Sequence, residues 1–94
     1  NLTEPGADLP LVLALASSRQ NTPLPSDLAA IGEVGLTGEV RAVSYMDSRL
    51  AELQRLGFRT VMVPHQGTAA TVPPEGMEIK RVKNIGQAIS EVLQ

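Results

Sequence analysis

The sequence predicts an α/β domain in which helices pack on a mixed sheet. Segments with a helical spacing of apolar residues alternate along the chain with short runs rich in Val, Ile and Thr. Glycine, proline or asparagine stands at most of the boundaries between these segments. With 94 residues, 43% of them hydrophobic, residues 1–94 are expected to form a single domain around one core.

The first expected helix covers residues 8–18. Asp8 is the expected N-cap, and Pro10 is acceptable because amides of the first turn have no partner within the helix. Apolar side chains occupy all sides of this segment, so we expect it to be buried on several sides. It therefore predicts contact with a further part of the protein or with another subunit. Residues 21–27 follow as a loop.

Two strands, residues 29–34 and 39–43, are expected to form a hairpin. The turn between them is Gly35-Leu36-Thr37-Gly38, whose two glycines can supply the positive φ angles of a tight turn. Ser44 and Asp47 then fit a capping box that would start the second helix.

The second helix is expected to bury one face and to end at Gly57. A buried strand (58–63), a loop (64–76) and an alternating strand (77–82) should follow, with Met77, Ile79 and Arg81 on one face of that last strand. Asn84 is the expected cap of the final helix. The apolar faces of the two helices are Met46, Leu50, Leu53 and Leu56, and Ile85, Ala88, Ile89, Val92 and Leu93.

The composition excludes several kinds of site. The chain has no cysteine and one histidine, which rules out disulfides and thiolate zinc sites, and His65 is expected to be a solvated loop residue. The only long apolar run, residues 9–16, is too short to cross a bilayer. No positively charged segment precedes that run, so we expect no signal peptide, no membrane partner and a cytoplasmic location.

DNA contact would require local clustering of basic residues. The net charge is −2 and there is one Phe, one Tyr and no Trp, whereas nucleic-acid binders are usually basic and often stack bases on aromatic rings. The candidate DNA-binding residues are Arg41 with Arg49, and Lys80 with Lys83. Ordinary solvated charges or partners of salt bridges between subunits are the alternative interpretation.

The residues alone suggest no catalytic site. The turn 35–38 does not open a helix and lacks the lysine of a phosphate-binding loop. Asp47 and Glu52 are typical of acids that stabilise a helix dipole, and Ser17 and Ser18 have no base nearby in the sequence. Composition and pattern therefore favour an α/β scaffold or interaction domain.

Residues 31–43 and 49–64 together resemble the Lon protease domain, in which a Gly-Glu strand, a glycine-containing turn and a second strand lead into a helix. The similarity extends over residues 5–93. It implies a Lon-protease-like fold, also called ribosomal protein S5 domain 2-like. In that fold the first strands would precede Asn1, so the chain would be the C-terminal part of a longer protein.

The resemblance also implies that peptidase activity has been lost. Lon-type hydrolysis uses a serine activated by a lysine, and in this register those positions hold Gly6 and Asp47, while Ile31 replaces a threonine. The alternative is a degenerate Ser-Lys peptidase with a relocated nucleophile, using Lys80 or Lys83. The candidate serines are Ser17, Ser18, Ser26, Ser44, Ser48 and Ser90.

Within this superfamily the chain is most similar to the C-terminal domain of the RadA (Sms) family. The shared features are residues 32–41, Arg49, residues 56–58, Val63-Pro64 and residues 74–77. The resemblance implies a non-catalytic scaffold of an ATP-dependent DNA repair, recombination and branch-migration protein that forms a homo-oligomeric ring, a hexamer, on DNA. ATP, Mg and Zn would belong to upstream domains, with no cofactor in this segment. A stand-alone protein-interaction module is a further alternative.

Overall fold

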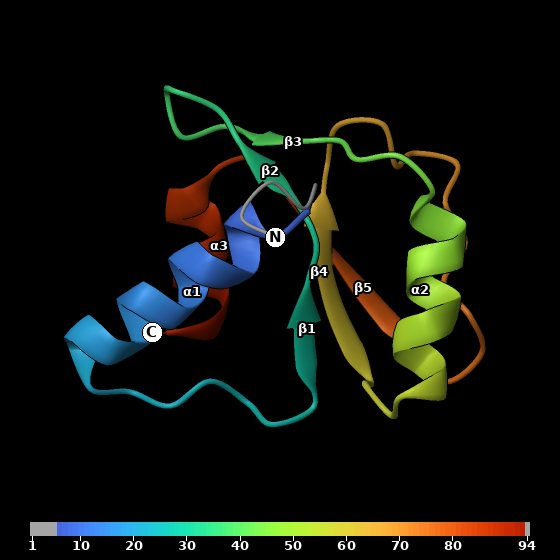
Figure 1. Cartoon of the computed structure of the whole chain (residues 1–94), viewed down its shortest axis with the longest axis horizontal. Coiled ribbons are helices and arrows are strands. Elements are labelled where there is room, and N and C mark those ends of the chain that lie inside the picture. Colours follow the sequence, from blue (N-terminus) through green and yellow to red (C-terminus); the bar gives the residue numbers. More distant parts are fainter. Residues whose placement is uncertain (1–5, 94) are drawn as a thin grey trace.

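A three-stranded parallel sheet stands at the centre of the computed structural model, which describes residues 6–93 (Figure 1). The strands lie in the order β1 (Leu28–Ala30), β4 (Thr60–Pro64) and β5 (Glu78–Val82). Helices α1 (Asp8–Gln20) and α3 (Ile85–Val92) cover one face, and α2 (Met46–Arg55) covers the other. The predicted α/β class is confirmed. The antiparallel pair, β2 (Glu33–Val34) with β3 (Val40–Arg41), forms a separate two-stranded sheet.

The first predicted strand, residues 29–34, is in fact two strands. Its beginning pairs in parallel with β4, and its end pairs antiparallel with β3. Between them the N–H of Ile31 still donates to the Met62 carbonyl at 2.9 Å, whereas the N–H of Gly32 turns to the Gly6 carbonyl at 3.1 Å. A Cβ on Gly32 would lie 2.8 Å from Val40 Cγ1. The chain leaves the sheet at this glycine, where a side chain would press on Val40.

The two faces of the sheet carry two hydrophobic clusters. Alternation along β4 divides them: Met62 packs toward α1 and α3, while Val61 and Val63 pack toward α2. The buried members are Leu9, Leu13, Val40, Met62, Val82 and Ala88 on the first side, and Ile31, Leu50, Val61, Val63 and Met77 on the second. The face that we predicted for the α2 segment is buried at Leu50, but Leu56 is 58% exposed.

Two of the three predicted helix caps are wrong. Asp8 is the first residue of α1 rather than its cap, because its carboxylate accepts the N–H of Val34 at 3.0 Å and ties the helix to β2. Ser44 does not cap α2, because Tyr45 takes that place in a left-handed conformation, with φ 63° and no side-chain cap. Asn84 is confirmed as the cap of α3.

Burial of α1 is one-sided. Leu9 and Leu13 are buried, but Leu11 and Leu15 are 59% and 61% exposed. The predicted contact of this helix on several sides is therefore not made among residues 6–93, and an apolar stripe faces outward.

The loop between β4 and β5 is held by Arg81, which we had placed on the same strand face as Met77 and Ile79. Its guanidinium donates to the Thr68 carbonyl at 3.1 and 3.2 Å and to the Thr71 carbonyl at 2.9 Å. The hydroxyl of Thr68 is buried and donates to the Pro64 carbonyl at 2.6 Å. A loop rich in Pro, Gly and Thr is thus ordered by one partly buried cation.

Candidate functional site

The position that the Lon resemblance assigns to the nucleophile, Gly6, lies in a closed and crowded place. Gly6 is buried with φ 94°. A Cβ placed on it would lie 3.2 Å from Ile31 Cγ2, 3.4 Å from an Arg49 guanidinium nitrogen and 3.8 Å from Val43 Cγ1. The structure therefore brings together Gly6, Ile31 and Arg49, and it leaves no space for a serine hydroxyl to approach a substrate.

Asp47, the position assigned to the lysine, is not among these nearest neighbours of Gly6. It is exposed on the first turn of α2 and lines a different hollow of about 250 Å³, with Leu50, Ala70, Val72 and Pro74. The basic group beside Gly6 is supplied two residues later by Arg49, whose Nε also donates to the Ser44 carbonyl at 2.9 Å. A sequence register alone could not show which of the two side chains turns toward Gly6.

The largest hollow near this place lies between β1 and α2. Its volume is about 370 Å³, and it is lined by Ala30, Ile31, Ser48, Arg49, Glu52 and Leu53. The lining is mainly apolar, and α2 contributes Arg49 and Glu52 to it; the Glu52 carboxylate is paired with Arg55. Such a hollow can accept an apolar side chain.

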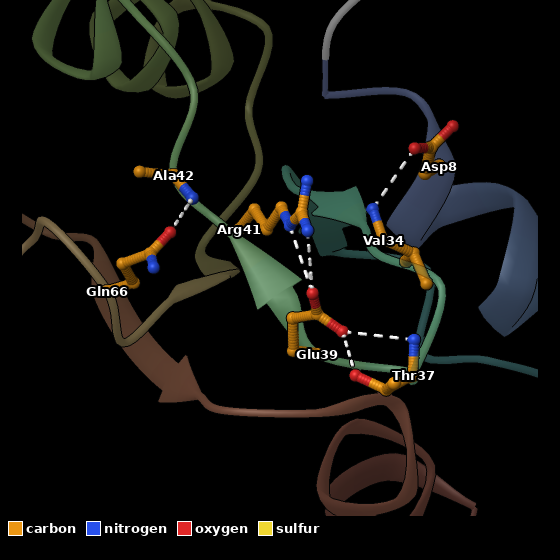
Figure 2. Close-up of polar contacts among 7 residues, drawn as sticks. All are labelled: Asp8, Val34, Thr37, Glu39, Arg41, Ala42 and Gln66. Carbon is orange, nitrogen blue, oxygen red and sulfur yellow. Dashed lines mark hydrogen bonds and ion pairs between the residues drawn. The ribbon is translucent and has the colours of Figure 1, made fainter.

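The hairpin turn contains a polar network that the sequence analysis missed. The Glu39 carboxylate accepts the N–H of Thr37 at 3.2 Å, the Thr37 hydroxyl, and Nε and Nη2 of Arg41 at 3.1 and 2.9 Å (Figure 2). The hydrogen bond from Thr37 and the other donors lower the pKa of Glu39 from 4.5 to about 2. The signal was present in the sequence, because residues 37, 39 and 41 have the spacing of one strand face.

The four candidate DNA-binding residues do not form one cluster of unpaired cations. Arg41 is paired with Glu39 at 2.9 Å, and Lys80 on β5 lies 3.9 Å from a carboxylate oxygen of Glu91 on α3. The Arg49 guanidinium lies beside Gly6, and Lys83 is exposed just before α3.

The remaining candidates do not converge on a catalytic arrangement in the part of the chain that the structure describes. His65 is exposed, as predicted. The Ser17 hydroxyl donates to the Thr22 carbonyl at the end of α1. Residues 6–93 contain no group of three His, Asp or Glu side chains that could hold a metal ion, and none of their helices is long and apolar enough to cross a membrane.

Comparison with known proteins shows the family to which the chain belongs. Residues 4–67 match the family described as subunit ChlI of Mg-chelatase, and relatives that align with nearly the whole chain are named DNA repair protein RadA. The chain belongs to this ChlI-type domain family and, within it, to the RadA proteins. The RadA resemblance predicted from the hairpin is thereby confirmed.

The RadA relatives come from distant bacteria. The chain is 48% identical to RadA of Escherichia coli over 92 residues, which is 95% of this chain and 19% of that protein. It is 42% identical to RadA of Aquifex aeolicus over 93 residues (99% and 20%), and 41% identical to RadA of Bacillus subtilis over 88 residues (94% and 19%). The chain thus spans about a fifth of the length of the RadA relatives that it matches.

Proposed function

We propose that this domain is a non-catalytic, Lon-like scaffold of a RadA-type DNA repair and recombination protein, and that it helps to hold a ring of subunits, six in number, together. The ATP-dependent branch-migration activity, with its ATP, Mg and Zn, is proposed for the other four-fifths of such a protein. A protein that repairs bacterial DNA would act in the cytoplasm. The exposed leucines of α1 and of the hairpin support an assembly role, because they are free for contact with other subunits.

One observation carries the non-catalytic part of the proposal, namely the packing around Gly6. A nucleophile needs a side-chain oxygen, a nearby base and space for the reacting carbonyl. Gly6 has no side chain, Ile31 occupies the adjacent space, and the neighbouring base position holds an arginine, which stays protonated. Each of these three features by itself opposes acyl transfer.

The first test is peptide hydrolysis. The chain, incubated with unfolded casein or a fluorogenic peptide, should give the rate of buffer alone. The double variants Gly6→Ser/Asp47→Lys and Gly6→Ser/Arg49→Lys should be equally inactive, because neither removes Ile31 or supplies the buried shell that lowers a lysine pKa. A rate above the buffer rate that a single Ser→Ala change abolishes would instead establish the degenerate peptidase.

Contact with DNA is a second part of the proposal, and the pairing of the cations makes it a weak one. Carboxylates already pair with Arg41 and Lys80, so Lys83 should contribute more than these two cations to any phosphate contact. In a ring, each weak contact would be repeated and would gain from multivalency.

We expect the chain to bind single-stranded DNA feebly in fluorescence anisotropy, with affinity falling steeply as salt is added. Lys83→Glu should weaken binding more than Arg41→Glu or Lys80→Glu does, with Arg59→Glu, an exposed cation next to β4, as the matched control. Binding that is unchanged in Lys83→Glu would leave assembly as the only role.

A further inference from the structure

The hollow that Asp47 lines lies between α2 and the loop that joins β4 to β5. Its volume is about 250 Å³, and its other lining residues are Leu50, Ala70, Val72 and Pro74, all of them apolar. Val72 is 78% exposed, although its side chain is large and apolar. Exposed apolar surface around a hollow with one polar group is typical of a binding site.

The polar group of this hollow is a carboxylate without a cation. Asp47 is exposed and forms no ion pair within residues 6–93. The carboxylate of Glu52, later on the same helix, lines the other hollow and is already paired with Arg55. Asp47 is therefore available to a cation from outside the domain, whereas Glu52 is not.

The wall opposite α2 is held in place by hydrogen bonds at two points of the loop. The Arg81 guanidinium donates to the carbonyls of Thr68 and Thr71, at 3.1 and 3.2 Å and at 2.9 Å. Further along, the side-chain amide of Gln54 donates to the Glu75 carbonyl and joins the loop to α2. The hollow therefore exists before a ligand arrives, and binding would order little of the loop.

The chemistry of the lining selects among possible occupants. A purely apolar side chain would cover the Asp47 carboxylate and leave it without a partner, which costs free energy. A phosphate group would be repelled by the same carboxylate.

A lysine side chain meets both requirements of the hollow. Its four methylene groups are apolar and can lie against the lining, while its ammonium pairs with the carboxylate and keeps its other donors in water. Arginine carries five donors in a fixed fork, which is more than one carboxylate at an apolar wall can accept.

We propose that this hollow is a docking site for a lysine of a partner protein. The stem of the lysine lies against Leu50, Val72 and Pro74, and its ammonium pairs with the carboxylate of Asp47. The contact uses the α2 side of the domain and does not depend on the proposed scaffold function, so either can fail without the other.

The test is a titration of the chain with a blocked tripeptide that has lysine between two alanines, followed by heteronuclear NMR. The amide signals of Asp47, Leu50, Ala70 and Val72 should shift together. Asp47→Asn should weaken the affinity about two- to fivefold, as expected for one exposed ion pair. Asp27→Asn, which changes an exposed carboxylate before β1, is the matched control and should leave the affinity unchanged.

A second peptide isolates the ammonium. Norleucine in place of lysine keeps the stem and removes the charge, so this peptide should bind the unmodified chain no more tightly than the lysine peptide binds Asp47→Asn. Val72→Ser, which shortens the apolar wall at an exposed position, should weaken the binding of both peptides.

Three results would overturn the proposal. Equal affinities of the two peptides for the unmodified chain would mean that Asp47 contributes nothing. Shifts around Asp27 as large as those around Asp47 would mean general attraction between charges. Shifts of the Asp47 and Val72 signals with the concentration of the chain alone, abolished by Lys83→Gln, would place a lysine of a second copy in the hollow instead of a partner protein.

Discussion

Two glycines of this domain each stand against a charged side chain, and they illustrate different kinds of crowding. A Cβ on Gly6 would press on Ile31 and on the Arg49 guanidinium in a buried position. A Cβ on Gly35 would overlap the carboxylate of Glu39, which lies at the surface. The nearest neighbour of Gly6, Ile31, is a buried residue of the core, whereas the nearest neighbour of Gly35 is the end of a flexible side chain that can swing away.

The comparison indicates what each region contributes. Close approach at Gly6 is part of the packing between the start of α1 and the α2 side of the sheet, so it should matter for the stability of the domain. Close approach at Gly35 brings the Glu39 carboxylate over the turn, so it should matter for the shape of the tip and its response to acid. Gly6 would then have a role in the stability of the whole domain, and Gly35 a role in the conformation of the hairpin turn.

The largest effect is expected at Gly6. Gly6→Ala forces a side chain into a backbone conformation with φ 94° and into contact with Ile31, and together these should cost about 2–4 kcal/mol of unfolding free energy. Urea denaturation followed by circular dichroism measures this loss.

Gly57→Ala is the matched control for that measurement. Gly57 has φ 98°, but nothing lies within 4 Å of the Cβ it would acquire. Gly57→Ala should therefore lower the unfolding free energy only by the cost of the backbone conformation, about 1–2 kcal/mol. Equal losses in the two variants would mean that the crowding at Gly6 is relieved without cost, and the distinction drawn above would fail.

A smaller effect, confined to acid, is expected at Glu39. Its pKa falls from 4.5 to about 2 on folding, so its contribution to stability is present above pH 4.5 and is lost as the pH falls through 2. Thermal unfolding midpoints measured across this window should fall less in Glu39→Gln than in the unmodified chain. Gly35→Ala should have the same effect without removing the carboxyl group, because the new methyl group displaces it.

Glu75→Gln, on the loop before β5, is the control for this experiment and should retain the full acid sensitivity of the unmodified chain. If Glu39→Gln and Gly35→Ala lose stability with acid as steeply as this control does, the hydrogen bonds to Thr37 and Arg41 do not survive in solution.

Local signals in the sequence predicted the helices well and their caps poorly. The position of α3 followed from its apolar spacing and from Asn84, whose Oδ1 accepts the Gln87 N–H at 2.8 Å. Ser44 had the right chemistry for a cap, but Tyr45 adopts the left-handed conformation next to it and α2 begins only after that. Backbone conformations of this kind are imposed by the tertiary structure, and propensity does not report them.

Only part of the candidate functional region was predicted from the sequence, because the rest depends on the tertiary structure. Gly6 and Ile31 were singled out from the sequence, and the structure places them so close that a Cβ on Gly6 would lie 3.2 Å from Ile31 Cγ2. Arg49 replaces Asp47 as their charged neighbour because the rotation of α2 about its axis decides which side chain faces inward. The hydrogen bonds from Arg81 to the carbonyls of Thr68 and Thr71 were missed, since every residue has a backbone carbonyl and the sequence does not show which of them will accept.

The parallel pairing of β1 with β4 has a consequence for the order in which the domain is made. Leu28 pairs with Thr60, about thirty residues further along the chain, and β4 in turn pairs with the still later β5. On a ribosome, β1 and α1 therefore emerge well before any strand of the central sheet can join them. The hairpin, whose two strands are neighbours in sequence, can close early, but the sheet beneath it forms only when translation has passed β4. A nascent chain that stops before residue 60 would display α1 and β1 with half of a core, and such exposed apolar surface is what chaperones recognise.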